Sequence, residues 1–238
     1  MSEHRIRLFC LPYAGGSARL YQQWQQALPD TVEVWPLELP GRGSRFGEPP
    51  YERLEPLVDD VVAAVQDAQQ RSDLPFALFG YSFGSVAAYE AALRLEAVGR
   101  PPVSLTVAAF RSPAAAPPAT SRASLPDAEF RAVVGKLGGT PRELLDNDAF
   151  MAMALPVIRA DLRIADTYGH RSGPPLGCPV AAFAGADDPL FAVADVAGWA
   201  RHTTEPFTLH VVPGDHFFFH SHQEQLCKTL GAALTAHC

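Results

Sequence analysis

The sequence predicts an α/β fold in which a mostly parallel sheet is covered by helices on both faces. Short apolar runs alternate with amphipathic segments along the 238-residue chain, and the links between them are short. Repeated strand–helix units place successive strands in one parallel sheet, because each crossover helix brings the chain back to the same edge. One long segment without a convincing strand interrupts this alternation, which indicates an insertion.

The N-terminal half begins with an apolar run of strand length at residues 6–11. The link AGGS then leads to an expected helix over residues 18–28, for which Ser17 offers a capping hydroxyl. Residues 32–39 form a second extended stretch that Pro40 and Gly41 end. The next helix has its apolar face at positions 54, 57, 58, 61, 62 and 65.

The third strand is expected at residues 76–79, which are apolar throughout and so typical of a strand buried on both faces. An alanine-rich helix follows from residue 85, with apolar side chains at helical spacing, and Gly99 and Pro101 stop it. The remaining strands are expected at residues 104–110, 180–184 and 207–212. Helices are expected at residues 192–201 and 223–236.

Residues 113–171 are expected to form a helical insertion, which leaves residues 1–112 and 172–238 as the core. The insertion opens with a run rich in Pro, Ala and Ser and continues as amphipathic helical pieces. It is either extra helical bulk or a lid over the edge of the sheet. For a lid, the candidate pocket residues are Phe150, Met151 and Met153, because flexible, polarizable methionines suit a pocket that accepts varied groups.

Composition narrows the class of protein. A formal charge of −7 argues against binding nucleic acid through a basic surface. The N-terminus lacks the apolar run of a signal peptide, and no later stretch has transmembrane length. The four cysteines have neither zinc-binding nor disulfide-framework spacing. We therefore expect a cytoplasmic protein with reduced thiols, no membrane contact, and a monomeric state by default.

A hydroxyl lies between two glycines at the corner Gly80-Tyr81-Ser82-Phe83-Gly84. Turning from strand to helix with almost no loop forces an unusual backbone on the middle residue, and the glycines remove side chains that would collide with it. This G-x-S-x-G pattern is typical of a nucleophile elbow, which holds a serine out at the end of a strand. The alternative is an ordinary glycine-rich turn whose serine caps the helix.

A serine nucleophile requires a base and a residue that orients the base. Asp187 and Asp188 follow the strand predicted at 180–184, and His216 follows the one at 207–212, so both lie at the edge of the sheet where Ser82 lies. The order serine, acid, histidine is the one expected for an elbow of this kind. Ser82, Asp188 and His216 are therefore the predicted triad. The spacing Gly-x-x-Asp favours Asp188 over Asp187.

Two backbone N–H groups are candidates for stabilising the negatively charged oxygen of an acyl-transfer transition state. One belongs to Phe83, which follows the serine. The other is expected in the loop after the first strand, where paired glycines let the backbone approach a ligand. Ala14 is the first candidate there and Tyr13 the second; the alternative is a glycine-rich turn without catalytic duty.

A metal site is a further possibility, because His216, His220 and His222 lie close together in sequence. No H-E-x-x-H or carboxylate-bearing spacing accompanies them. We therefore expect His220 and His222 to be surface or supporting residues and no metal to be bound.

Together these stretches resemble the type II thioesterases that accompany polyketide and nonribosomal peptide synthases, within the α/β-hydrolase superfamily. The motifs that carry the resemblance, in order, are LPYAGGSA, LELPGRGSRFGEPP, GYSFGS, GADDP and GDHFF. The family often has histidine at the positions of Tyr13 and Tyr81. We therefore expect these two tyrosines and Phe217 to shape the substrate pocket, without changing the chemistry.

The resemblance implies hydrolysis of acyl groups from the 4′-phosphopantetheine arm of acyl or peptidyl carrier proteins, through an acyl-enzyme on Ser82 and without a cofactor. This activity would clear stalled or misprimed chains from a synthase. Arg42, Arg45 and Arg53 are candidates for contacting the carrier or the phosphate, although Arg42 is favoured to tie down its own loop. The alternatives are a carboxylesterase, a lipase, an acyl-CoA thioesterase, a chain-terminating or cyclising thioesterase, and a catalytically silent binding protein of the same fold.

Overall fold

The structure, a computed structural model, describes residues 5–169 and 173–235. Its centre is a six-stranded sheet with strand order β2-β1-β3-β4-β5-β6, in which every neighbouring pair is parallel. The strands are β1 (Ile6–Leu11), β2 (Val32–Pro36), β3 (Phe76–Tyr81), β4 (Ser104–Ala108), β5 (Val180–Gly185) and β6 (Phe207–Val212). The predicted α/β architecture is therefore confirmed.

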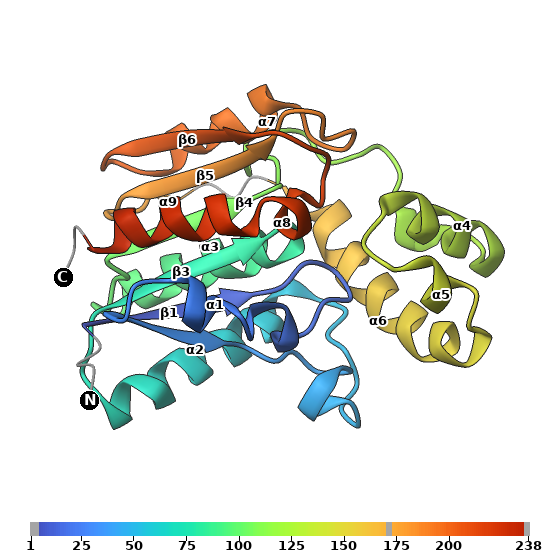
Figure 1. The fold of residues 1–238 in the computed structure, drawn as a ribbon, viewed down its shortest axis with the longest axis horizontal. Coiled ribbons are helices and arrows are strands. Elements are labelled where there is room, and N and C mark those ends of the chain that lie inside the picture. Colours follow the sequence, from blue (N-terminus) through green and yellow to red (C-terminus); the bar gives the residue numbers. More distant parts are fainter. Residues whose placement is uncertain (1–4, 170–172, 236–238) are drawn as a thin grey trace.

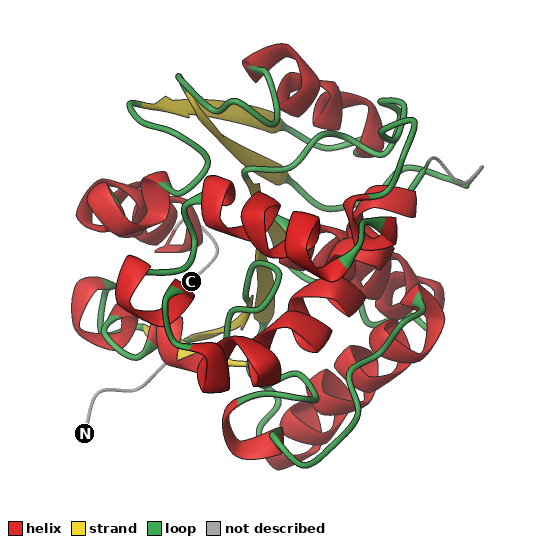
Figure 2. Cartoon of the chain, turned by 90° about the vertical axis from the view of Figure 1, so that its right-hand side faces the viewer, coloured by secondary structure: helices red, strands yellow, loops and turns green. Residues whose placement is uncertain are grey.

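Helices cover both faces of this sheet (Figures 1 and 2). The α-helices are α1 (Trp24–Ala27), α2 (Leu54–Arg71), α3 (Phe83–Ala97), α4 (Asp127–Leu137), α5 (Arg142–Leu145), α6 (Asp148–Thr167), α7 (Val193–Ala197), α8 (Phe218–Ser221) and α9 (Gln223–Thr235). Short 3₁₀ helices are η1 (Ala18–Tyr21), η2 (Gly43–Arg45), η3 (Arg122–Ser124) and η4 (Gly198–His202).

Two apolar cores lie on opposite faces of the sheet. Helices α2 and α3 contribute to one, through side chains such as Leu57 and Val86 that pack with Leu78. Helices α1 and α9 contribute to the other, through Trp24 and Leu226. Within the described residues, every helix falls short of the length and apolar character that a bilayer span requires.

The helix expected at residues 18–28 is interrupted. It divides into η1 and α1, and Tyr21 and Trp24 are both buried on the same face of the sheet. Residues three apart align on a 3₁₀ turn, which suits this pair, and the hydroxyl of Tyr21 donates to the carbonyl oxygen of Leu11 at 2.7 Å. Ser17 makes no side-chain cap; instead the N–H of Ala18 donates to Oε1 of Glu38 at 3.1 Å.

Several other expected boundaries shift by a few residues. The second strand ends at Pro36, and the fourth at Ala108, because Ala109 has φ 52° and leaves the extended conformation. The helix expected at residues 192–201 is α7 continued by η4. The last helix is described to Thr235, and its expected end at residue 236 lies outside the described residues.

The segment predicted as a helical insertion contains η3, α4, α5 and α6 in its described part, which ends at residue 169. Helices α4, α5 and the N-terminal part of α6 project beyond the ends of the strands (Figure 1). They enclose an apolar core of their own, with Phe130 and Val134 of α4 packed on Met151 and Ile158 of α6. The expected boundary at 171/172 lies outside the described residues.

Candidate active site

The corner between β3 and α3 has the backbone that its sequence predicts. Ser82 has φ 51° and ψ −118°, an unusual conformation for a residue with a side chain. A Cβ at Gly80 would lie 2.3 Å from the carbonyl oxygen of Gly84, and one at Gly84 would lie 2.4 Å from that of Leu11. Ser82 makes no side-chain cap on α3. The glycines are therefore required for close backbone contact, and the serine hydroxyl is available to other partners.

The structure brings Ser82, His216 and Asp188 together. The Nε2 atom of His216 lies 3.0 Å from Oγ of Ser82, and its Nδ1 atom lies 2.8 Å from Oδ2 of Asp188. The side chains of His216 and Asp188 are 5% and 1% exposed. Such a buried chain of hydroxyl, imidazole and carboxylate is the arrangement that activates a serine for attack on a carbonyl.

Asp188, rather than Asp187, faces the imidazole. Its second oxygen, Oδ1, accepts hydrogen bonds from the backbone N–H groups of Leu190 at 2.8 Å and Phe191 at 3.3 Å. Asp187 is exposed, and its N–H donates to the carbonyl oxygen of Gly214 at 2.9 Å, which holds the two loops side by side. The carboxylate of Asp188 is therefore fixed from one side while it accepts from His216 on the other.

Tyr81 supports the histidine loop and does not line the cavity, contrary to its prediction as a pocket residue. Its ring is fully buried, and its hydroxyl donates to the carbonyl oxygen of His216 at 2.8 Å and accepts from the N–H of Phe219 at 3.3 Å. Burial raises the pKa of Tyr81 well above its usual value, so the phenol stays protonated. Neighbouring residues on a strand point to opposite faces, and here that sends Tyr81 toward the core.

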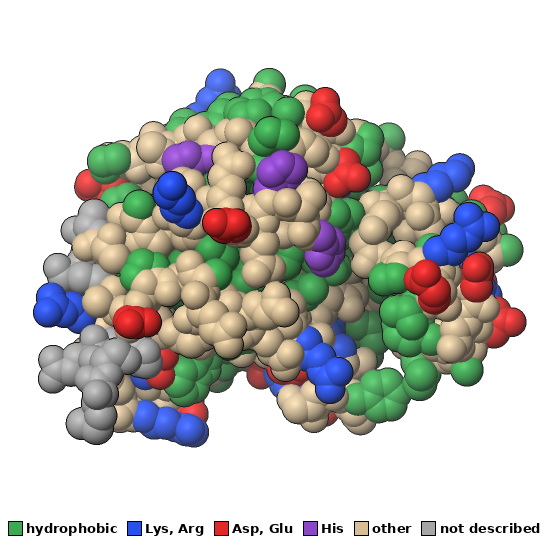
Figure 3. Space-filling view, viewed as in Figure 1, with side chains coloured by type: hydrophobic (Ala, Val, Ile, Leu, Met, Phe, Trp, Pro, Cys, Tyr) green, Lys and Arg blue, Asp and Glu red, His purple; other side chains and the backbone are tan. Residues whose placement is uncertain are grey.

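A cavity of about 350 Å³ opens beside Ser82 and His216, and the molecular surface is hollowed between the core and the helices of the insertion (Figure 3). Three of the predicted pocket residues line it: Tyr13, Phe150 and Phe217. Burial raises the pKa of Tyr13 to about 12, so its hydroxyl is neutral near pH 7. Aromatic and apolar side chains thus make up most of the cavity wall beside the hydroxyl of Ser82.

The two methionines do not line this cavity, contrary to their prediction. Met151 is 1% exposed and packs inside the core of the insertion, and Met153 is 50% exposed on the surface. The residues of α6 that face the cavity are spaced four apart and so share one face of the helix: Phe150, Ala154, Ile158 and Leu162. The four-residue spacing of apolar side chains in the sequence, and not the flexibility of methionine, indicates which residues line the cavity.

Two backbone N–H groups predicted as donors lie beside Ser82. Phe83 is the first residue of α3, and the first N–H groups of a helix have no acceptor within it. Ala14 lines the cavity together with Ser82. Within the described residues, the N–H groups of Ala14 and Tyr13 have no hydrogen-bond acceptor in the protein. These donors are therefore free to bind an oxygen of a ligand.

The three arginines proposed for contacts with a carrier protein have carboxylate neighbours. Arg42 is buried and paired with Asp161 at 2.6 Å, whereas Arg45 pairs with Glu48 and Asp60. Arg53 is exposed, 3.7 Å from Glu55.

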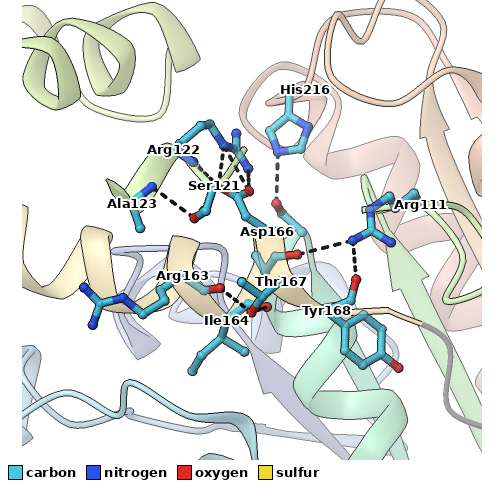
Figure 4. Close-up of polar contacts among 12 residues, drawn as sticks. Arg111, Ser121, Arg122, Ala123, Arg163, Ile164, Asp166, Thr167, Tyr168 and His216 are labelled. Carbon is cyan, nitrogen blue, oxygen red and sulfur yellow. Dashed lines mark hydrogen bonds and ion pairs between the residues drawn. The ribbon is translucent and has the colours of Figure 1, made fainter. Parts of the chain in front are cut away.

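Two other arginines, Arg19 and Arg122, line the cavity. The close-up shows how Asp166 holds Arg122 (Figure 4), with Nη2 of the arginine 2.5 Å from Oδ1 of the carboxylate. Arg19 is exposed.

The other histidines make ordinary contacts. Nε2 of His220 lies 3.4 Å from the hydroxyl of Tyr13, and Nδ1 of His222 lies 2.9 Å from Oγ of Ser221. The ring of His220 packs against Phe217 and Phe219, and burial lowers the pKa of His220. In the part of the chain that the structure describes, no three His, Cys, Asp or Glu side chains are grouped as metal ligands.

Known proteins resemble this chain over nearly its full length. The family model described as "Thioesterase domain" matches residues 6–234. Thioesterase PikA5 of Streptomyces venezuelae is 38% identical over 226 residues, which cover 94% of this chain and 79% of that protein. Linear gramicidin dehydrogenase LgrE of Brevibacillus parabrevis, whose name denotes another reaction, is 37% identical over 240 residues, which cover 99% of this chain and 90% of that protein.

Among solved structures, RedJ, a thioesterase from the prodiginine biosynthetic pathway of Streptomyces coelicolor, is similar with a TM-score of 0.88 and 38% identity. The alignment covers 96% of this chain and 85% of that chain.

Proposed function

Because this chain belongs to the thioesterase domain family and is a thioester hydrolase, we propose that it releases acyl groups from the phosphopantetheine arm of carrier proteins. Its role is then to edit stalled or misprimed polyketide or nonribosomal peptide synthases. The relatives named as thioesterases, one of them from a biosynthetic pathway, support this assignment. The observation that carries the hydrolytic chemistry is the continuous chain of hydrogen bonds from Ser82 through His216 to Asp188.

In the first half of the reaction, Oγ of Ser82 attacks the thioester carbonyl carbon. Nε2 of His216 accepts the serine proton across the 3.0 Å contact, and Asp188 stabilises the resulting imidazolium from the other side. The carbonyl oxygen becomes negatively charged and accepts hydrogen bonds from the N–H groups of Phe83 and Ala14, each worth about 10²–10³ in rate. The pantetheine sulfur then leaves, taking the proton, and the acyl group remains on Ser82.

In the second half, water replaces the thiol. The water oxygen attacks the acyl carbon while His216 accepts a proton from the water. The same backbone donors stabilise the second tetrahedral intermediate. Collapse returns the proton to Oγ of Ser82 and releases the carboxylic acid. A thiol is a good leaving group, so the residues present suffice without further acid catalysis.

The cavity supports an acyl substrate rather than a polar one. Its lining from α6 is apolar, with Phe150, Ala154 and Ile158 facing the space beside Ser82. Tyr13 and Phe217 also line the cavity, with ring centroids 5.0 Å apart. Burial of apolar acyl carbons against these side chains supplies binding free energy that grows with chain length.

The proposal includes a cytoplasmic, monomeric enzyme. All the groups proposed for catalysis come from one chain, so a monomer suffices for the reaction. Cys10, Cys178 and Cys227 are free and buried, which suits a reducing compartment.

A substrate comparison tests the proposal. One acyl group is presented on a carrier protein, on free pantetheine, on coenzyme A and as a p-nitrophenyl ester, and the initial rates of release are compared. We expect kcat/KM to be highest for the carrier protein. The proposal would be contradicted if oxygen esters were turned over orders of magnitude faster than thioesters. It would also be contradicted if turnover required a nicotinamide cofactor, as for the dehydrogenase reaction that one relative's name suggests.

A further inference from the structure

A buried polar cluster joins helix α6 to the loops that follow β1 and β2. Oδ2 of Asp161, on α6, lies 2.6 Å from Nη1 of Arg42 and 2.8 Å from the backbone nitrogen of Gly15; Oδ1 lies 2.9 Å from Nη2 of Arg42. The side chains of Arg42 and Asp161 are only 7% and 3% exposed. One carboxylate therefore holds the loop after β1 and is itself held by the loop after β2.

These contacts fix the turn that carries Ala14. The N–H of Gly16 donates to the carbonyl oxygen of Tyr13 at 2.8 Å, and the N–H of Gly15 donates to Asp161. Gly15 has φ +76°, and a Cβ there would lie 2.5 Å from Cγ1 of Ile158, so the turn lies directly against α6. The N–H groups of Gly15 and Gly16 are thus bonded within the protein, whereas among the described residues the N–H of Ala14 has no acceptor and is open to a ligand.

A contribution to the free energy of unfolding is by itself a weak explanation for the buried ion pair of Arg42 and Asp161. Two charges lose their water on burial, and well-packed apolar side chains of similar volume often stabilise a protein as well or better. What apolar side chains lack is an acceptor for the N–H of Gly15. The distinctive contribution of Asp161 is therefore the orientation of the backbone beside Ala14.

We propose that Asp161, held in place by Arg42, is a positioning residue for the oxyanion hole. It fixes Gly15 so that the N–H of Ala14 points at the developing negative charge beside Ser82. This inference rests on the proposed function. Such a donor stabilises the transition state to the extent that its geometry is set beforehand, so the cluster acts on kcat rather than on KM. Helix α6, which lines the cavity, would then also fix the orientation of the Ala14 N–H.

A matched pair of double variants isolates the acceptor. Arg42→Leu/Asp161→Asn removes both charges but keeps an amide oxygen for the N–H of Gly15, whereas Arg42→Leu/Asp161→Leu removes the charges and the acceptor. We expect kcat on an acyl-pantetheine to be about 10- to 100-fold lower for the leucine variant than for the asparagine variant, somewhat less than the cost of deleting a donor. KM is expected to stay within about twofold for both, and thermal melting is recorded for each.

A second buried arginine serves as control. Arg7 pairs with Glu33 at 2.7 Å near the start of β1, at the opposite end of the strand from the Ala14 turn. We expect Arg7→Leu/Glu33→Leu to leave kcat unchanged, whatever its melting temperature. Arg7 is buried and Glu33 is partly exposed. A loss of kcat there equal to that of the leucine variant would make the effect a general one of removing an ion pair that involves a buried arginine, and would overturn the proposal.

Hydrogen exchange of the unsubstituted protein provides a measurement that does not depend on the variants folding. We expect the Gly15 amide to be protected in the free enzyme, and the Ala14 amide to become protected only when an alkylboronic acid adds to Ser82. A Gly15 amide that exchanges as fast as that of Ala14 would overturn the proposal. So would equal kcat in the two double variants, provided that Ser82→Ala is inactive in the same assay. Wild-type turnover by Ser82→Ala would instead refute the proposed function itself.

Discussion

The two halves of helix α6, before and after Pro156, are held in different ways. After the proline, the buried carboxylates of Asp161 and Asp166 accept hydrogen bonds from Arg42 and Arg122, while Ile158 and Leu162 continue the apolar wall of the cavity. Before it, the helix contributes mostly apolar side chains to the cavity and to the core of the insertion. A proline in a helix removes one backbone donor at this junction.

This difference separates two tasks. Polar contacts have strict distances and angles, so the half next to the catalytic loops is held in one geometry. Apolar packing tolerates changes of shape when volume is conserved, so the half before the proline, which contributes mostly apolar side chains, is freer to vary. Substitutions at polar contacts are therefore expected to cost turnover, and substitutions at the apolar wall are expected to change substrate preference.

The largest effect is expected at the nucleophile. Ser82→Ala removes the attacking oxygen, and kcat for an acyl-pantetheine should fall by about 10⁶-fold. The melting temperature should stay within a few degrees, because the serine side chain caps no helix. Steady-state hydrolysis and circular dichroism together check this, and substantial residual turnover would place the nucleophile elsewhere.

The next largest loss of kcat is expected at Asp188, and the adjacent Asp187 provides the matched control. Asp188→Asn keeps the side-chain shape but removes the charge that orients His216, and kcat should fall by about 10⁴-fold. Asp187→Asn changes an exposed side chain and should leave kcat within about threefold. Both variants are assayed on the same substrate. The reverse order of effects would move the acid to Asp187.

A smaller effect is expected from Tyr81, which holds the histidine loop. Tyr81→Phe leaves the buried carbonyl oxygen of His216 without its donor, which should lower the free energy of unfolding by about 1–3 kcal/mol. A modest loss of kcat without a change in KM should accompany it, because the backbone of His216 is less well fixed. Denaturant unfolding and steady-state kinetics measure the two. A change confined to KM would mean that Tyr81 acts on the substrate pocket after all.

The smallest catalytic effect is expected on the apolar wall. Phe150→Ala enlarges the cavity, so the ratio of kcat/KM between long and short acyl groups should rise by about tenfold. Met153→Ala, three residues further along α6 and half exposed, is the control and should leave the ratio unchanged. A panel of acyl-pantetheines measures both ratios, and equal responses would remove the distinction between the two faces of the helix.

The positions of the strands along the chain and the edge of the sheet that carries the site could be predicted from the sequence, because both depend on local patterns. Apolar runs of strand length mark the sheet, and the chemistry lies where parallel strands end. The tight corner at Ser82 was readable because sterics at its glycines act within a few residues. Few side chains near the strand ends can act as a base or an acid, so His216 and the pair Asp187 and Asp188 were the candidates.

Contacts between distant segments could not be predicted in this way. Arg42 and Asp161 are 119 positions apart, and no local pattern pairs them. In the divided helix at residues 18–28, the hydroxyl of Tyr21 donates to the carbonyl oxygen of Leu11, a contact with another element that forms only in the folded state. By contrast, the wrong assignment of Met151 and Met153 to the pocket was avoidable, since the four-residue spacing from Phe150 already defines another face of α6.

Reaction with a fluorophosphonate, followed by peptide mapping and residual-activity measurement, tests the proposed nucleophile most directly. We expect one phosphonyl group per chain, attached to Oγ of Ser82, with thioester hydrolysis lost in proportion to labelling. Turnover that persists in fully labelled protein, or inactivation that maps to another residue, would contradict the proposed role of Ser82.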